Sequence, residues 1–138
     1  MAETIRIRIL IADPIPEAGI ALLRRALPAA QVDERAGLPP ALLREVVSDY
    51  TALIVRSATQ VTADLLAKAS RLRVVGRAGV GLDNIDVEAA ERLGIRVVYS
   101  PTGNVAAAAE HTIAQIQVAL DVAEQIVSAL REPSLCPA

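Results

Sequence analysis

Residues that could bind an anion follow two apolar runs in the middle of the chain. Arg56-Ser57 comes directly after the first run, and the segment Arg77-Ala78-Gly79-Val80-Gly81 comes after the second. Guanidinium groups bind carboxylates and phosphates through paired N–H groups, and a turn of small residues ahead of a helix exposes backbone N–H groups to such a ligand. These residue types predict an anion pocket. The candidate anion-binding residues are Arg56, Ser57, Arg77, Gly79, Val80 and Gly81.

Each of these residues also has a structural interpretation. Arg56 could form an ion pair with a surface acid such as Asp49 or Asp64, and Gly79 and Gly81 could simply allow a tight turn. The glycines alone are therefore a weak signal. Their position relative to the strands is the stronger argument.

The hydrophobic pattern places these residues in an alternation of strands and helices. Alternating elements with short connections predict an α/β fold, a three-layer αβα sandwich around a parallel sheet. The second strand is the most polar and so suits an exposed edge, which favours the strand order 2-1-3-4-5. We expect strands near residues 5–11, 31–34, 53–55, 72–75 and 95–99, and helices near residues 16–27, 39–47, 62–69, 84–93 and 104–131.

The carboxyl ends of the strands are where a sheet of this kind binds its ligands, next to the point at which strand order reverses. In the expected order, that point lies between the first and third strands. Asp13, Arg56-Ser57, the segment 77–81 and the segment 100–104 all follow strands and meet at this edge. The topology therefore brings both arginines to one side of the sheet.

The last helix is unusually long for a domain of this size. From residue 104 to residue 131 its apolar positions form one continuous seam. Such a helix is about 42 Å long, against about 17 Å for a strand of five residues. One end must therefore overhang, bend or find a partner, and a second copy of the chain is one candidate.

Composition excludes several classes of partner and site. The chain has 138 residues, a formal charge of −2 and 53% hydrophobic residues, so no basic field attracts nucleic acid or an anionic membrane. No apolar run is long enough to span a bilayer, which takes about 18 residues. The one cysteine, Cys136, cannot form an internal disulfide, and a reducing, cytoplasmic setting is expected.

Catalytic and cofactor signals are weak. The one histidine, His111, lacks the neighbouring ligands that a metal site needs, and no nucleophile, base and orienting group occur together. The run Gly79-Val80-Gly81 begins like a dinucleotide fingerprint, but Asn84 occupies the third glycine position and the ribose-binding acid is missing about 20 residues later. The residues favour binding over catalysis, with no catalytic residue and no metal.

Three segments together resemble the D-3-phosphoglycerate dehydrogenases of the D-2-hydroxyacid dehydrogenase family. The resemblance implies a flavodoxin-like substrate domain, which in this family is interrupted by a nicotinamide-binding domain. Here residues 1–114 resemble the part before the interruption and residues 115–138 the helix that returns after it, so 1–138 is expected to form a single domain. The segments are Arg56 to Thr62, Gly76 to Asp86, and Gly103-Asn104 with Ala108 to Thr112.

The resemblance also implies what is lost with the interruption. The NAD fingerprint and the catalytic arginine, glutamate and histidine of the family belong to the missing segment, so no cofactor is expected and the chain should be inactive alone. Arg56, Ser57, Arg77 and the backbone of 79–81 would face the substrate, a small phosphorylated 2-hydroxy or 2-oxo acid, and Asn104 would lie near the cofactor. A homodimer through the last helix and an active NAD-dependent fragment are the alternatives.

Overall fold

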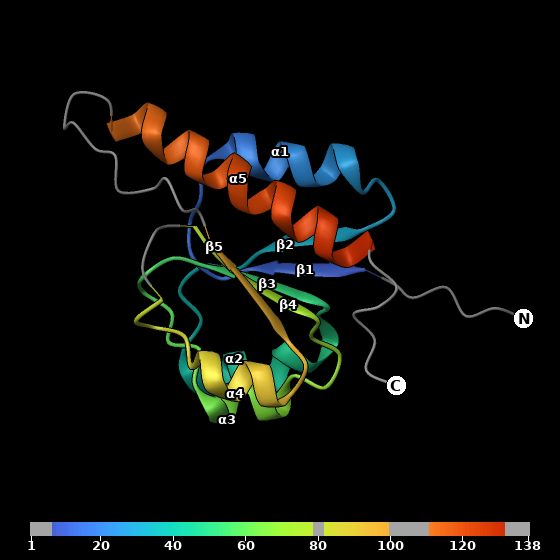
Figure 1. The fold of residues 1–138 in the computed structure, drawn as a ribbon, viewed down its shortest axis with the longest axis vertical. Helices are drawn as coiled ribbons and strands as arrows, with labels where there is room; N and C mark the ends of the chain where they lie inside the picture. Colours follow the sequence, from blue (N-terminus) through green and yellow to red (C-terminus); the bar gives the residue numbers. More distant parts are fainter. Residues whose placement is uncertain (1–6, 79–81, 100–110, 132–138) are drawn as a thin grey trace, which may run out of the picture.

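The computed structural model describes residues 7–78, 82–99 and 111–131 (Figure 1). Within these ranges, strands and helices alternate along the chain as predicted. The strands are β1 Arg8–Ile11, β2 Gln31–Glu34, β3 Ala52–Val55, β4 Val74–Arg77 and β5 Arg96–Tyr99. The helices are α1 Glu17–Ala26, α2 Pro40–Val46, α3 Ala63–Lys68, α4 Val87–Arg92 and α5 His111–Arg131, and a single 3-10 turn, Val47–Asp49, follows α2.

The five strands form one parallel sheet in the order β2-β1-β3-β4-β5. The predicted fold class and strand order are therefore confirmed. Every residue of β3 is buried, whereas both ends of β2 are exposed. This contrast follows from the sequence, because a strand covered on both faces tolerates only apolar residues and an edge strand accepts polar ones.

Helices cover both faces of the sheet, with α1 and α5 on one face and α2, α3 and α4 on the other (Figure 1). Alternate residues of β1 supply two separate cores, since neighbouring side chains on a strand point to opposite faces. Ile9 and Ile11 pack with α1 and α5, and Leu10 packs with the α2, α3 and α4 layer. These two aliphatic cores hold the carboxyl ends of the strands in place.

Several element boundaries differ from the predictions, and two of the differences have a local cause. Strand β4 begins at Val74 rather than at Leu72, because Leu72 belongs to the turn that follows α3. Helix α4 begins after Asp86, whose carboxylate accepts a hydrogen bond from the Ala89 N–H at 3.0 Å as the N-cap. The expected start at residue 84 is too early because Ile85 forms an isolated bridge with Val61.

Close contacts dock α5 onto the rest of the fold. A Cβ atom on Gly76 of β4 would lie 2.8 Å from Val122 Cγ1, and one on Gly19 of α1 would lie 3.0 Å from the Ala119 Cβ. Both glycines therefore allow α5 to approach closely, a role that the sequence alone did not indicate. From Val118 to Leu130 the apolar seam of α5 is buried within the chain.

This packing bears on the predicted dimer. The seam between residues 118 and 130 is covered by α1 and the sheet and is not offered to a second copy of the chain. Residues 104–110 of the predicted helix lie outside the described residues, so a dimer through the last helix stays a prediction. No helix among the residues that the structure describes is both long and apolar enough to cross a membrane.

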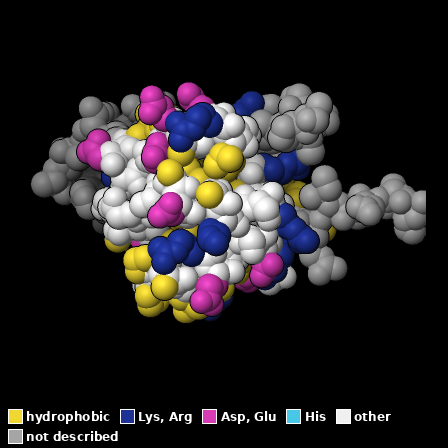
Figure 2. Space-filling view, turned by 90° about the horizontal axis from the view of Figure 1, so that it is seen from below, with side chains coloured by type: hydrophobic (Ala, Val, Ile, Leu, Met, Phe, Trp, Pro, Cys, Tyr) yellow, Lys and Arg dark blue, Asp and Glu magenta, His cyan; other side chains and the backbone are white. Residues whose placement is uncertain are grey.

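The outer face of the α2, α3 and α4 layer carries side chains of both charges. Lysine and arginine are interspersed there with acidic and apolar side chains (Figure 2). A mixed surface of this kind does not create the single-sign field that attracts polyanions. The charge pattern on this face agrees with the composition.

Candidate functional site

The loop between β3 and α3 is held at the carboxyl edge of the sheet by Asp13, which follows β1. The Asp13 carboxylate accepts hydrogen bonds from the Arg56 N–H at 2.7 Å, the Thr59 N–H at 3.1 Å and the Thr59 hydroxyl at 2.7 Å. Asp13 is 4% exposed. A buried carboxylate of this kind is stable because its oxygens are hydrogen-bonded, and here all the donors belong to one loop.

Asn84 holds the same loop from the side of β4. Its Nδ2 donates to the Arg56 carbonyl at 2.5 Å and to the Thr59 carbonyl at 2.7 Å, and its Oδ1 accepts a hydrogen bond from Arg77 Nε at 2.8 Å. Asn84 is 7% exposed. One buried amide therefore joins the backbone of the first predicted arginine to the side chain of the second.

These contacts place the predicted residues as follows. Arg56 is half-buried, and its guanidinium Nη1 makes a long 3.5 Å hydrogen bond to the Pro14 carbonyl. Ser57 is exposed at the tip of the loop, and Arg77 is half-buried at the end of β4. The segment 79–81 and Asn104 lie outside the described residues, so the positions predicted for them stay predictions.

Arg56 does not form the ion pair with Asp49 or Asp64 that was the structural alternative for its role. Among the described residues, Asp49 pairs with Arg8 at 3.9 Å rather than with Arg56, and Asp64 lies in the first turn of α3 with no ion pair to Arg56. The Arg56 guanidinium therefore carries its charge at the edge of the sheet where the topology predicts a ligand.

The sequence predicts Asp13 at this edge, but it does not predict that Asn84 and Thr59 help to hold the loop. In the sequence Asn84 only interrupts a dinucleotide fingerprint, whereas in the structure its amide supports the loop from Arg56 to Thr59. A buried polar group must find hydrogen-bond partners, but the burial of Asn84 is visible only in the folded chain.

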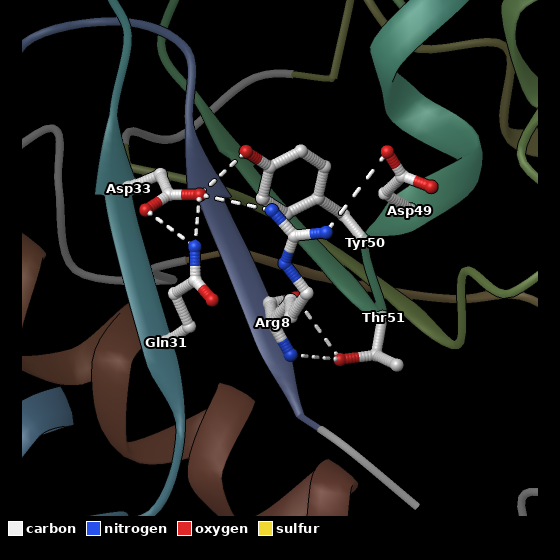
Figure 3. Close-up of polar contacts among 6 residues, drawn as sticks. All are labelled: Arg8, Gln31, Asp33, Asp49, Tyr50 and Thr51. Atoms are coloured by element: carbon white, nitrogen blue, oxygen red, sulfur yellow. Dashed lines mark hydrogen bonds and ion pairs between the residues drawn. The ribbon is translucent and has the colours of Figure 1, made fainter.

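A second polar cluster lies at the opposite, amino edge of the sheet (Figure 3). The Tyr50 hydroxyl donates to Asp33 Oδ2 at 2.6 Å, and Gln31 Nε2 donates to the same carboxylate at 3.1 Å. Arg8 Nη2 lies 3.5 Å from Asp33 Oδ2, and the Arg8 guanidinium carbon lies 4.8 Å from the centre of the Tyr50 ring. The side chains of this cluster are thus paired with one another.

This pairing perturbs the titration of the cluster. Burial alone would raise the pKa of Asp33, but hydrogen bonds from Tyr50 and Gln31 and the charge of Arg8 lower it overall. Burial raises the pKa of Tyr50, and the hydrogen bond to the Asp33 carboxylate raises it further. Both shifts favour the ionised carboxylate beside the neutral phenol. The cluster joins β1, β2 and the segment just before β3, so its contacts are those of a structural unit.

The chemistry available at the carboxyl edge is anion binding. Within the described residues, no group of three or more His, Cys, Asp or Glu side chains could hold a metal ion. The side chain of His111 is outside the description. Arg56 and Ser57 on the loop and Arg77 at the end of β4 offer two guanidinium groups and a hydroxyl. Such groups can bind a carboxylate or a phosphate.

Comparison with known proteins identifies the family. Residues 9–135 match the model of the D-isomer specific 2-hydroxyacid dehydrogenase catalytic domain. The chain is 48% identical over 109 residues to the D-3-phosphoglycerate dehydrogenase of Synechocystis, covering 79% of the chain and 19% of the relative. It is 40% identical over 125 residues to the enzyme of the same name from Methanocaldococcus jannaschii, covering 91% of the chain and 23% of that protein.

Solved structures show the same fold. The crystal structure of NAD+-bound 3-phosphoglycerate dehydrogenase from Entamoeba histolytica matches with a TM-score of 0.61 at 25% identity, over 71% of this chain and 33% of that one. A crystal structure from Thermus thermophilus matches with a TM-score of 0.64 at 30% identity, over 70% and 31%. The chain spans about a fifth of the length of these two curated relatives. It belongs to the D-isomer specific 2-hydroxyacid dehydrogenase family.

Proposed function

We propose that this chain binds the carboxylate or phosphate of a small 2-hydroxy or 2-oxo acid at the carboxyl edge of the sheet, as an isolated half of a substrate cleft. Arg56 and Arg77 supply the positive charge and Ser57 supplies a hydroxyl. The proposal also assigns residues 79–81, which lie outside the described residues, to the site. The phosphoglycerate dehydrogenase names of the relatives favour a phosphorylated three-carbon acid as the ligand.

The observation that carries the proposal is the position of Asn84 between the two arginines. It bonds to the Arg56 carbonyl and to Arg77 Nε, so both arginines belong to one hydrogen-bonded unit. The loop therefore does not have to be ordered when an anion binds, which lowers the entropy cost of binding. Arg56 is half-buried and Ser57 is exposed, so water weakens each charge contact, and we expect millimolar affinity.

The described residues do not fit a dinucleotide. A fingerprint of this type needs a glycine where Asn84 stands, because the helix must pack closely against the strand. Instead, Asn84 is buried and both ends of its amide are bonded within the chain. Hydride transfer depends on the nicotinamide cofactor, so the proposed function is binding without redox activity.

Amide chemical shifts of isotope-labelled protein test the proposal directly. Adding 3-phosphoglycerate or phosphohydroxypyruvate should move the Arg56 and Ser57 amides, with saturation in the millimolar range. Arg56→Gln should weaken this binding several-fold. Arg92→Gln, which removes an exposed charge from α4, is the matched control and should leave it unchanged.

Two outcomes contradict the proposal. An absence of shifts at tens of millimolar ligand shows that there is no half-site, and equal weakening by Arg56→Gln and Arg92→Gln shows a non-specific charge effect. NADH oxidation is followed in the same samples. Turnover above the blank would favour the alternative of an active NAD-dependent fragment.

A further inference from the structure

We infer that a cavity behind the Arg56 to Gln60 loop is a separate binding site for a short aliphatic carboxylate. The cavity has a volume of about 330 Å³ and lies between α2 and α3, with the loop as its third wall. Small-molecule sites usually begin at about 300 Å³, so the cavity suits a ligand of only a few carbons. This inference does not rest on the proposed function, because neither Arg56 nor Arg77 lines the cavity.

The walls of the cavity are mostly apolar. Leu43 of α2 and Leu65 of α3 are buried side chains that line it, and Leu38 is half-buried at its edge. These positions belong to the core formed with the α2, α3 and α4 layer. An alkyl chain entering the cavity would leave water and contact aliphatic side chains, which is the favourable direction for apolar surface.

The charge at the rim specifies the sign of the ligand. Arg44 of α2 lines the cavity, is exposed, and forms no ion pair with any residue that the structure describes. The acid that also lines the cavity, Asp13, has its carboxylate oxygens bonded to Arg56 and Thr59. A carboxylate at the rim is therefore complemented by Arg44, while the alkyl chain lies against the leucines.

The cavity shares one wall with the loop of the anion site. Thr59 lines the cavity and donates its hydroxyl hydrogen to Asp13 Oδ1. A ligand in the cavity would contact the inner side of the loop, while Arg56 and Ser57 remain on its outer part. The two ligands are therefore expected to bind at the same time and at different residues.

The test compares hexanoate with hexanol by amide chemical shift titration. Hexanoate should move the Leu43, Thr59 and Leu65 amides, and hexanol should move the same amides with two- to fivefold weaker affinity, the range given by an exposed ion pair of about 0.4 to 1 kcal/mol. Arg44→Gln should weaken hexanoate by the same factor and leave hexanol unchanged.

A second pair of variants tests the location. Ala58 lines the cavity and is exposed. Ala58→Leu should therefore block the binding of both hexanoate and hexanol. Ala67→Leu, at an exposed position on α3, is the control and should leave the binding of both unchanged. Undiminished binding to Ala58→Leu, or equal weakening of hexanoate and hexanol by Arg44→Gln, overturns the proposal. Arg56→Gln must leave hexanoate binding intact, which separates this site from the anion site. Loss of both ligands in Arg56→Gln would also overturn it.

Discussion

The two edges of the sheet use similar polar residues in opposite ways. At the amino edge, the Asp33 carboxylate contacts the side chains of Tyr50, Gln31 and Arg8. The charges of Asp33 and Arg8 are therefore paired within the fold. At the carboxyl edge, Asp13 binds mainly backbone and hydroxyl groups of one loop. The first arrangement ties strands together and leaves little for a ligand. The contacts of Asp13 fix the loop through its backbone and the Thr59 hydroxyl, and they leave the Arg56 guanidinium available to a ligand.

Burial explains why the two carboxylates should differ in importance. Asp13 is 4% exposed, whereas the Asp33 side chain is 25% exposed. Removing the acceptor from a buried N–H leaves that donor unsatisfied, while water replaces a lost partner at a half-exposed site. We therefore expect the stability of the carboxyl edge to depend mainly on Asp13, and that of the amino edge to be shared among several residues.

The largest expected effect is that of Asp13→Ala on the free energy of unfolding. The change leaves the N–H groups of Arg56 and Thr59 without an acceptor, and we expect a loss of about 3 kcal/mol. Asp33→Ala, the matched change at the other edge, should cost about 1 kcal/mol because its partners reach water. Urea unfolding measures both. An equal cost for the two variants would contradict the comparison.

Asn84→Ala should act on the loop as well as on stability. It removes the donor to the Arg56 and Thr59 carbonyls and the acceptor of Arg77 Nε, and we expect a loss of about 2 kcal/mol. Hydrogen exchange should rise at Thr59 more than at Tyr50. A uniform rise at both edges would mean that the amide supports the whole fold rather than this loop.

The sequence predicted the sheet better than it predicted the site. Hydrophobic runs such as Leu53-Ile54-Val55 fix the strands, and the polar strand Gln31–Glu34 fixes the edge. These are local patterns, and strand order follows from them through general rules. The predicted positions of Arg56 and Ser57 at the carboxyl edge rest on the same reasoning.

The supports of the site could not be predicted because they join distant parts of the chain. Asp13 and Thr59 are 46 residues apart, and Asn84 and Arg56 are 28 apart. No local periodicity reports such contacts. The space required at Gly76 is likewise visible only once α5 lies over the sheet. Long-range polar contacts and close packing need the assembled fold.

Tyr50→Phe tests whether the two edges are independent, with a smaller expected loss of stability. The variant loses the 2.6 Å hydrogen bond to Asp33 and should cost about 1 kcal/mol at neutral pH. It should leave the phosphoglycerate titration of the Arg56 amide unchanged, because the two clusters share no contact. A changed affinity would show that the edges are coupled through β1 or β3.

The pH dependence of that cost has a defined sign. The lowered pKa of Asp33 stabilises the fold above its unfolded pKa of about 4, and this stabilisation is lost as the pH falls through the folded pKa. The raised pKa of Tyr50 stabilises the fold below about pH 10, and this is lost as the pH rises through the folded pKa. The difference in unfolding free energy between wild type and Tyr50→Phe should therefore be flat from about pH 5 to 9 and shrink outside that window. A difference that grows at either extreme would contradict the assignment.

Arg56→Gln is expected to have the smallest effect on stability and the clearest effect on binding. Its backbone keeps the bonds to Asp13 and Asn84, and the side chain loses only a 3.5 Å contact with the Pro14 carbonyl. We expect a change within about 0.5 kcal/mol in urea unfolding, together with weaker anion binding in the titration. A stability loss as large as that of Asp13→Ala would place the guanidinium among the structural groups. The carboxyl edge would then resemble the amino edge, because the Arg56 guanidinium would be paired within the fold.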